Sequence, residues 1–184
     1  MRTIDRRSLI RAGLIAGLAG PNIALAQPAV VSAEQRLHDL KLQLPRFVTP
    51  RGGNNPPFVR TGNLLFLAGL GPRNPDGSYI TGKLGKDVTV QQGYQDARLA
   101  GLRALATLED ALGSLDKVTR VVKLLGMVNA TPEFSDLGRV INGCSDLFVQ
   151  VFGAVKGQHA RTLLGVASLP FNISVEIDLV VEAG

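Results

Sequence analysis

The longest regular pattern in the chain is a leucine repeat at helical spacing. Five leucines recur every three or four residues and so share one face of an α-helix. They are Leu99, Leu102, Leu105, Leu108 and Leu112. The helix is expected to begin after Thr89, because Thr89 and Gln92 have the spacing of a capping box, in which two side chains satisfy free backbone N–H groups. Gly113 follows the last leucine and is expected to end the helix in a left-handed conformation.

A second long helix is predicted after residue 130. Thr131 followed by Pro132 has the pattern of an N-cap and a first helical residue. This helix is expected to run to about Phe152, because Gly153 comes next. A short helix capped by Ser32 is expected nearer the N-terminus.

Strands are predicted on either side of these helices. Residues 63–69 (NLLFLAG) form a continuous apolar run, and residues 118–128 (VTRVVKLLGMV) are rich in β-branched side chains, so both are expected to be buried strands. Residues 161–181 predict a hairpin of two strands around a Leu-Pro-Phe-Asn turn. The order strand, strand, helix, strand, helix, strand, strand favours one α+β domain, with a mixed sheet and two helices on one face.

The predicted hairpin carries charge in an otherwise apolar segment. Successive side chains of a strand point to opposite faces, so the second strand has an aliphatic face and a charged face. The aliphatic face consists of Val175, Ile177, Leu179 and Val181. Glu176 and Asp178 lie on the other face, and a hairpin loop with an even residue count places Arg161 on their side.

The charged face has two interpretations. It is either an interface with another subunit that borders a water-filled cleft, or an ion pair between Arg161 and Glu176 or Asp178 that fixes an interface. In the first case the planar guanidinium of Arg161 is suited to bind a carboxylate through two parallel hydrogen bonds, and a nearby carboxylate can hold a water molecule.

The overall charge does not predict nucleic-acid binding. The chain has a net charge of +5. Residues 1–26 contain four arginines and one aspartate and so contribute +3, which leaves 5 − 3 = +2 for the rest of the chain. Hydrophobic residues make up 45% and aromatic residues 5% of the chain, which supports a sizeable aliphatic core but offers no basic patch interleaved with aromatics.

The cysteine and the two histidines give no credible metal site. Cys144 is the only cysteine, so no disulfide forms within the chain, and its place on an amphipathic helix predicts a buried thiol. His38 and His159 are far apart in sequence. His159 is expected to be a surface residue, although it could line a cleft beside Arg161.

The N-terminus has the features of an export signal. The pair Arg6 and Arg7 precedes a weakly apolar run that ends in Ala24-Leu25-Ala26, small residues at the spacing that signal peptidase recognises. We expect residues 1–26 to be a twin-arginine signal and residues 27–33 a linker. The mature protein would then be periplasmic or secreted, without stable membrane association after cleavage. An ordinary secretory signal and an uncleaved anchor are the alternatives.

Four separated segments resemble the Rid/YjgF family of reactive-intermediate (enamine/imine) deaminases, once labelled endoribonuclease L-PSP. ARTLLGVASLPFNISVEIDLVV, from Ala160, is similar to the family's C-terminal signature. The other segments are VRTGNLLFLAGLGP, GKDVTVQQGYQDARLAGLRALATLEDALGSLDKVTRVVKLLGMVNATPEF and VINGCSDLF. The resemblance covers about residues 34–184, and it implies a chorismate-mutase-like domain and a homotrimer with clefts between its subunits.

The resemblance also implies a reaction and a site. Members of this family hydrolyse reactive enamines and imines derived from amino acids to 2-ketoacids and ammonia, without a metal or an organic cofactor. Arg161 matches the arginine that binds the substrate carboxylate, and Glu176 matches the glutamate that activates the attacking water. Asn142 matches an asparagine of the family's second helix, and Gly69 matches the glycine that follows the early strand.

Some positions near the implied site depart from the deaminating members. Ala68 and Leu70 stand where many of those have serine and glutamine, Phe58 stands for a tyrosine, and Leu163 stands for a cysteine. The substrate-binding pocket, with Phe58 and Leu163 in its lining, is therefore expected to be more apolar. A non-catalytic trimer that binds small carboxylates through Arg161 is the alternative function.

Overall fold

The computed structural model describes residues 31–46 and 54–184. The predicted signal segment, residues 1–26, and residues 27–30 of the predicted linker lie outside this described part. None of the helices in the described part combines the length and the hydropathy that a bilayer-spanning segment requires.

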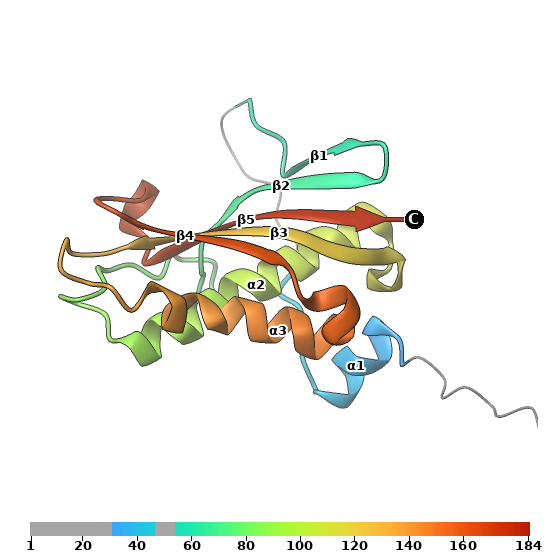
Figure 1. Cartoon of the computed structure of the whole chain (residues 1–184), viewed down its shortest axis with the longest axis horizontal. Coiled ribbons are helices and arrows are strands. Elements are labelled where there is room, and N and C mark those ends of the chain that lie inside the picture. The colour runs from blue at the N-terminus through green and yellow to red at the C-terminus, as the bar shows by residue number, and fades with distance from the viewer. Residues whose placement is uncertain (1–30, 47–53) are drawn as a thin grey trace, which may run out of the picture. The chain divides into compact units, whose positions relative to one another are not determined.

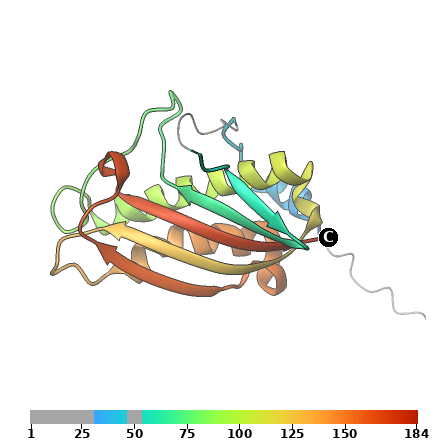
Figure 2. The same ribbon diagram turned by 90° about the horizontal axis from the view of Figure 1, so that it is seen from above.

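A five-stranded sheet organises the domain, with the strand order β1-β2-β5-β3-β4. The strands are β1 (Phe58–Thr61), β2 (Leu64–Leu70), β3 (Val118–Asn129), β4 (Ala160–Val166) and β5 (Val175–Ala183). All neighbouring strands are antiparallel except β3 and β4, which are parallel, so the prediction of a mixed sheet is confirmed. Figure 2, seen from above, shows β4 at one edge of the sheet and β1 at the other.

Two long helices cover one face of this sheet (Figure 1), as the α+β prediction requires. They are α2 (Val90–Leu112) and α3 (Leu137–Gly157), and a short helix, α1 (Ala33–Asp39), packs against α3. The capping box at the start of α2 is present, with the Gln92 backbone N–H donating to Thr89 Oγ1 at 3.2 Å. Gly113 ends α2 with φ of 76°, in the left-handed region that glycine favours.

The core lies between the sheet and the two helices. In β5 the buried side chains are Val175, Ile177, Leu179 and Val181, which are 0–1% exposed. The helices approach each other closely at Gly143, where an added Cβ would lie 1.9 Å from the backbone oxygen of Tyr94. Glycine is therefore required at this crossing of α2 and α3.

The start of the second long helix was predicted too early. Thr131 and Pro132 precede a turn in which the Phe134 N–H donates to the Thr131 carbonyl at 3.1 Å, and helix α3 begins only at Leu137. Gly153 was predicted to follow the end of this helix. It has a φ of 75° and interrupts the helical geometry, and one more turn follows it before α3 ends at Gly157.

The predicted C-terminal hairpin is wrong. Strands β4 and β5 do not pair with each other, because β3 lies between them and pairs with both. The Leu-Pro segment forms a 3₁₀ turn (Pro170–Asn172) within a connection that crosses over β3. This insertion reverses the expected orientation of Arg161.

Candidate functional site

Arg161 points to the helix side of the sheet. It lies opposite Leu124 of β3, whose buried side chain faces the helices. The Arg161 Nη1 donates to Asn142 Oδ1 at 2.7 Å and to Ser145 Oγ at 3.1 Å, and both acceptors belong to α3. The structure therefore brings Asn142 together with Arg161. The hydrogen bonds of Arg161 within the described residues all use Nη1, so Nε and Nη2 keep N–H groups to offer a ligand.

Ser145 and His159 belong to the same cluster; no pattern in the sequence pointed to Ser145, and a place beside Arg161 was only the alternative for His159. His159 Nε2 lies 3.1 Å from Ser145 Oγ, and His159 Nδ1 lies 2.7 Å from the Gly157 carbonyl oxygen. Burial lowers the pKa of His159 and the positive charge of Arg161 lowers it further, while the hydrogen bond to the Gly157 carbonyl opposes this shift. His159 is half-buried rather than a surface residue, so the alternative that it lines a cleft beside Arg161 is the better description.

An open-sided cavity of about 440 Å³ lies next to this cluster. Its lining residues are Ser145, Val149, Gln158, His159 and Arg161. The lining contains a guanidinium, a hydroxyl, an amide and an imidazole, but no carboxylate. The guanidinium in a lining without carboxylates is suited to a small anion.

Glu176 lies on the opposite face of the sheet. We call this the open face, meaning the side of the sheet that α2 and α3 do not cover. Glu176 pairs in register with Met127 of β3, and its neighbours Val175 and Ile177 point the other way, into the core. Burial raises the pKa of Glu176, and the negative charge of Asp178 raises it further. A carboxylate with a raised pKa is a stronger base than an ordinary glutamate.

Gly69 makes room for the Glu176 carboxylate. A Cβ at residue 69 would lie 1.8 Å from Glu176 Oε1 and 3.1 Å from Asp178 Oδ1. Gly69 belongs to an irregular part of β2, where the register against β5 shifts between Leu67 and Leu70. The structure therefore joins Gly69 with Glu176, and it gives a physical reason for glycine at this position.

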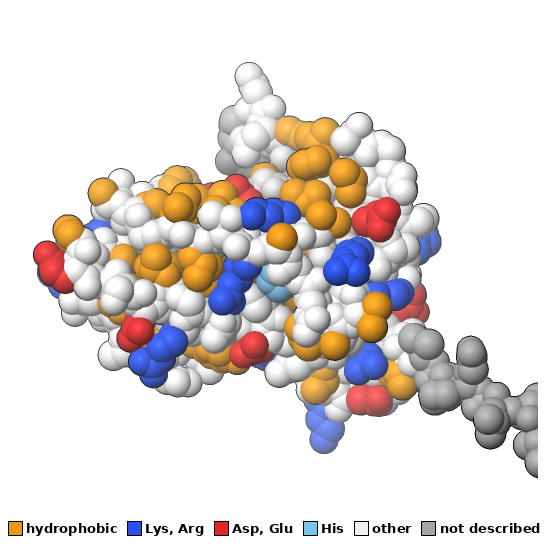
Figure 3. Space-filling model, in the orientation of Figure 1, with side chains coloured by type: hydrophobic (Ala, Val, Ile, Leu, Met, Phe, Trp, Pro, Cys, Tyr) orange, Lys and Arg blue, Asp and Glu red, His pale blue; other side chains and the backbone are white. Residues whose placement is uncertain are grey.

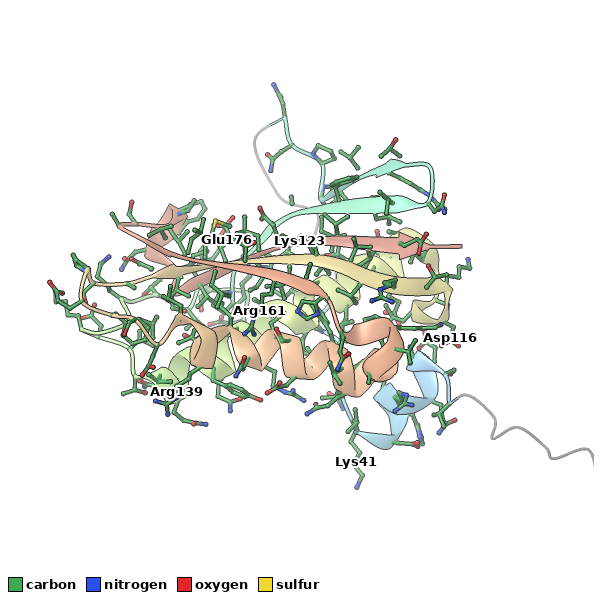
Figure 4. All side chains as sticks on the ribbon, viewed as in Figure 1. Lys41, Asp116, Lys123, Arg139, Arg161 and Glu176 are labelled. Carbon is green, nitrogen blue, oxygen red and sulfur yellow. The ribbon has the colours of Figure 1, made fainter. Side chains whose placement is uncertain are left out.

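Arg161 and Glu176 do not meet within one protomer. Figure 4 shows Glu176 above the sheet and Arg161 below it, beside α3. The prediction that they share a face is wrong, because it assumed that β4 and β5 pair directly. No salt bridge in the described part of the chain joins Arg161 to Glu176 or Asp178, so the ion-pair interpretation does not hold within the protomer.

The two apolar site candidates lie on the helix side. Leu163 follows Arg161 on the same face of β4, and an added Cβ at Gly138 of α3 would lie 3.7 Å from its Cδ1. Phe58 lies opposite Leu67 in the β1–β2 pair and packs against the core. Leu163 therefore accompanies Arg161, whereas Phe58 belongs to a different edge of the sheet from both Arg161 and Leu163.

The open face combines half-buried charges with exposed apolar side chains. Phe66 and Leu164 are 43% and 46% exposed there, and Lys123 donates to the Thr162 hydroxyl. A second cavity, of about 290 Å³, lies on this face and includes Phe66, Lys123 and Asp178 in its lining. Figure 3 shows hydrophobic side chains gathered on the upper part of the molecule, over β1 and β2. An exposed face of this composition is typical of a surface that contacts another subunit.

The remaining candidates have structural places. Cys144 is fully buried, as predicted, and burial raises the pKa of its thiol far above the ordinary value, which disfavours the thiolate form. Among residues 31–46 and 54–184, no group of three or more histidine, cysteine or acidic side chains is arranged to hold a metal ion.

Comparison with known proteins connects these observations to a family. The family model described as "YjgF/chorismate_mutase-like, putative endoribonuclease" matches residues 34–183. Protein TCP17 of Trypanosoma cruzi is 42% identical over 146 residues, which are 79% of this chain and 91% of that protein. A crystal structure of an Agrobacterium tumefaciens protein is 43% identical, has a TM-score of 0.73, and the match covers 82% of this chain and 91% of that chain.

A crystal structure of a Shewanella oneidensis protein is 30% identical to this chain and has a TM-score of 0.77. That match covers 82% of this chain and 99% of the other. The resemblance inferred from the four sequence segments is thus confirmed by the family model and by the fold. This chain belongs to the YjgF family, also called the Rid family.

Proposed function

We propose that this protein hydrolyses small reactive imines and enamines to 2-ketoacids and ammonia, at sites formed between the subunits of a homotrimer. Family membership makes this activity the first to consider. The observation that carries the proposal is the Arg161 cluster, in which Asn142 and Ser145 hold one nitrogen of an exposed guanidinium beside a cavity without carboxylates. A bidentate contact with a 2-iminoacid carboxylate matches this geometry.

Glu176 supplies the second half of the proposed chemistry. Water adds to the imine carbon as Glu176 takes one of its protons, the C=N π bond breaks, and Glu176 passes that proton to the nitrogen, which gives a carbinolamine. Glu176 then takes the hydroxyl proton of the carbinolamine and the nitrogen gains a proton, so that the C–N bond breaks and ammonia and the ketone separate. General-base assistance of this kind is typically worth about 10²–10⁴-fold in rate. The raised pKa of Glu176, caused first by burial, favours this role.

The opposite placement of Arg161 and Glu176 is the reason to propose an intersubunit site. A second copy of the chain must present its open face to the β4 edge of the first, so that Glu176 of one subunit approaches Arg161 of the next. The apolar part of the open face, including Phe66 and Leu164, would be covered in the same assembly. We expect light scattering to give three times the chain mass, and a monomer at micromolar concentration would contradict the intersubunit site.

The alternative function is a trimer that binds small carboxylates without turning them over. Leu163 beside Arg161 favours it, because an apolar side chain stands where the deaminating members offer a thiol. In both functions we propose that the protein acts outside the cytoplasm, after export directed by the Arg6–Arg7 segment. The ligand is a small carboxylate or imine, and no nucleic-acid partner is proposed.

A coupled assay tests the proposal. An amino-acid oxidase generates 2-iminoacids in the presence of semicarbazide, which traps them, and an active protein lowers the yield of the semicarbazone formed directly from the imine. We expect wild type to be active and Glu176→Gln to be reduced by about 10²-fold or more. Binding of 2-ketoacids without any imine turnover would favour the carboxylate-binding trimer.

A further inference from the structure

The hydrogen bonds around Ser145 form a directed chain that ends on Arg161. The Gly157 carbonyl oxygen can only accept, so His159 Nδ1 carries the hydrogen of the 2.7 Å contact between them. In a neutral imidazole the other nitrogen, Nε2, is then an acceptor. The Ser145 hydroxyl therefore donates to His159 Nε2 and accepts from Arg161 Nη1.

We propose that Ser145 and His159 are positioning residues of the Arg161 anion site, and that a proton on His159 strengthens carboxylate binding there. This inference rests on the proposed function, since it assigns the ligand of Arg161 to the carboxylate class. Ser145 accepts a hydrogen bond from Nη1 of the guanidinium and His159 contacts Ser145 in turn, while Nε and Nη2 make no hydrogen bond within the described residues. Neither residue was among the site residues that the family resemblance identified.

A proton on His159 changes both the hydrogen bonding and the charge of the cavity. Protonated Nε2 becomes a donor, so the Ser145 oxygen accepts from both His159 and Arg161, and its own hydrogen is released to a ligand. The imidazolium also adds a second positive charge to a cavity lined by no carboxylate. Both changes favour an anion.

The groups around His159 do not cancel this effect. On α3 it faces Ser145 and the edge of the Phe148 ring, whose centroid lies 6.1 Å from that of the imidazole. Asp146, the acid nearest to Ser145 in the helix, accepts a hydrogen bond from the Tyr94 hydroxyl on α2. Lys156 donates to the Val118 carbonyl.

On β4, Arg161 is the charged neighbour. Burial is the largest cause of the lowered pKa of His159; the hydrogen bond to the Gly157 carbonyl opposes it and Arg161 adds to it, so protonation of His159 is shifted to the acidic side of the ordinary histidine range. The switch is therefore expected in mildly acidic solution, in which the carboxylate of a 2-ketoacid stays ionised.

Calorimetric titration of the purified full chain with pyruvate, at pH 7.5 and pH 5.5, tests the inference. We expect wild type to bind about three- to tenfold more tightly at the lower pH, as one added charge nearby predicts. His159→Gln keeps an acceptor for Ser145 but cannot titrate, so its affinity for pyruvate should change little between pH 7.5 and pH 5.5, whatever its value at pH 7.5. His38→Gln is the matched control, because His38 is an exposed histidine on α1, and it should respond to pH as wild type does.

The outcomes separate this inference from the proposed function. If Arg161→Ala abolishes pyruvate binding but His159→Gln keeps the wild-type pH response, the role of His159 is refuted while the carboxylate site stands. If Arg161→Ala binds pyruvate as tightly as wild type, the proposed site itself is refuted. Ser145→Ala should weaken binding about tenfold or more at pH 7.5, the value of a hydrogen bond to a charged group, and unchanged affinity would refute its positioning role.

A pH titration of the wild-type protein tests the same inference and does not depend on a variant that folds correctly. Binding and protonation are reciprocally linked, so saturating pyruvate must raise the pKa of His159 if a proton on His159 strengthens pyruvate binding. Histidine ring signals followed by NMR against pH, with and without pyruvate, should show this rise for His159. An unchanged His159 titration in the presence of bound pyruvate would overturn the inference.

Discussion

Replacing Gly69 by alanine should displace the Glu176 carboxylate without unfolding the protein. The added Cβ would lie 1.8 Å from Glu176 Oε1, and ordinary contact begins near 3.4 Å, so the oxygen must move by at least 3.4 − 1.8 = 1.6 Å. The clash involves the far end of a flexible side chain rather than backbone. Gly69 is also not among the glycines with positive φ, so alanine is compatible with its backbone conformation.

A displacement of this size is large for a catalytic group. A misplacement of about 1 Å can lower a rate by about 10²-fold. We therefore expect Gly69→Ala to lower kcat in the semicarbazide assay by about 10²-fold, close to the effect of Glu176→Gln. The free energy of unfolding should change by no more than about 1 kcal/mol, since alanine also reduces the conformational freedom of the unfolded chain.

Gly165→Ala is the matched control for this experiment. Gly165 is another strand glycine without positive φ, and its added Cβ would meet nothing closer than 3.6 Å, the distance to a Leu137 methyl group. This variant should keep wild-type kcat. Wild-type turnover by a correctly folded Gly69→Ala protein would refute the argument that the position of Glu176 sets the rate.

Three further changes test other parts of the structure. Gly143→Ala should destabilise the fold by about 3 kcal/mol, measured by denaturant unfolding, because the Tyr94 backbone oxygen 1.9 Å away cannot swing aside; an unchanged midpoint would contradict the close helix crossing. Glu176→Gln should raise Tm at neutral pH, because burial raises the pKa of Glu176 and its charge therefore destabilises the folded state. This gain should vanish as the pH falls below the ordinary glutamate value of 4.5, and a lower Tm at neutral pH would instead indicate a stabilising ion pair. Arg6→Lys/Arg7→Lys should stop export of a reporter that folds before translocation, and continued export would reject the twin-arginine signal.

Local patterns in the sequence predicted the long elements well. The capping box at Thr89 and the leucine repeat identified α2, and the β-branched run identified β3, because these signals depend only on neighbouring residues. The helix start predicted at Thr131 and Pro132 was wrong because that signal, too, depends only on neighbouring residues. The pair is locally compatible with a helix start, but the hydrogen bond from the Phe134 N–H to the Thr131 carbonyl closes a turn instead.

The candidate site depends on strand pairings and long-range contacts that cannot be predicted from neighbouring residues alone. The segments of β4 and β5 look like a hairpin in sequence, and only the insertion of β3 between them turns Arg161 to the helix side. Ser145 and His159 are 14 residues apart and belong to different elements, so no periodicity connects them. The family resemblance supplied Arg161, Glu176, Asn142 and Gly69, and the structure adds how each of them is held.

The central claim is that Arg161 and Glu176 act together from different subunits. Arg161→Ala and Glu176→Gln trimers are each expected to be inactive, because every site lacks one of the two groups. If the two variant chains are unfolded, mixed in equal amounts and refolded, some sites receive Arg161 from one chain and Glu176 from the other.

Random assembly into trimers makes about one quarter of the sites complete, since each of the two positions is occupied by an intact residue with a probability of about one half. We therefore predict that the mixture recovers about one quarter of wild-type imine hydrolysis in the semicarbazide assay, relative to wild type refolded in the same way. A mixture no more active than the separate variants, with trimers formed and wild type recovered, would contradict the shared site.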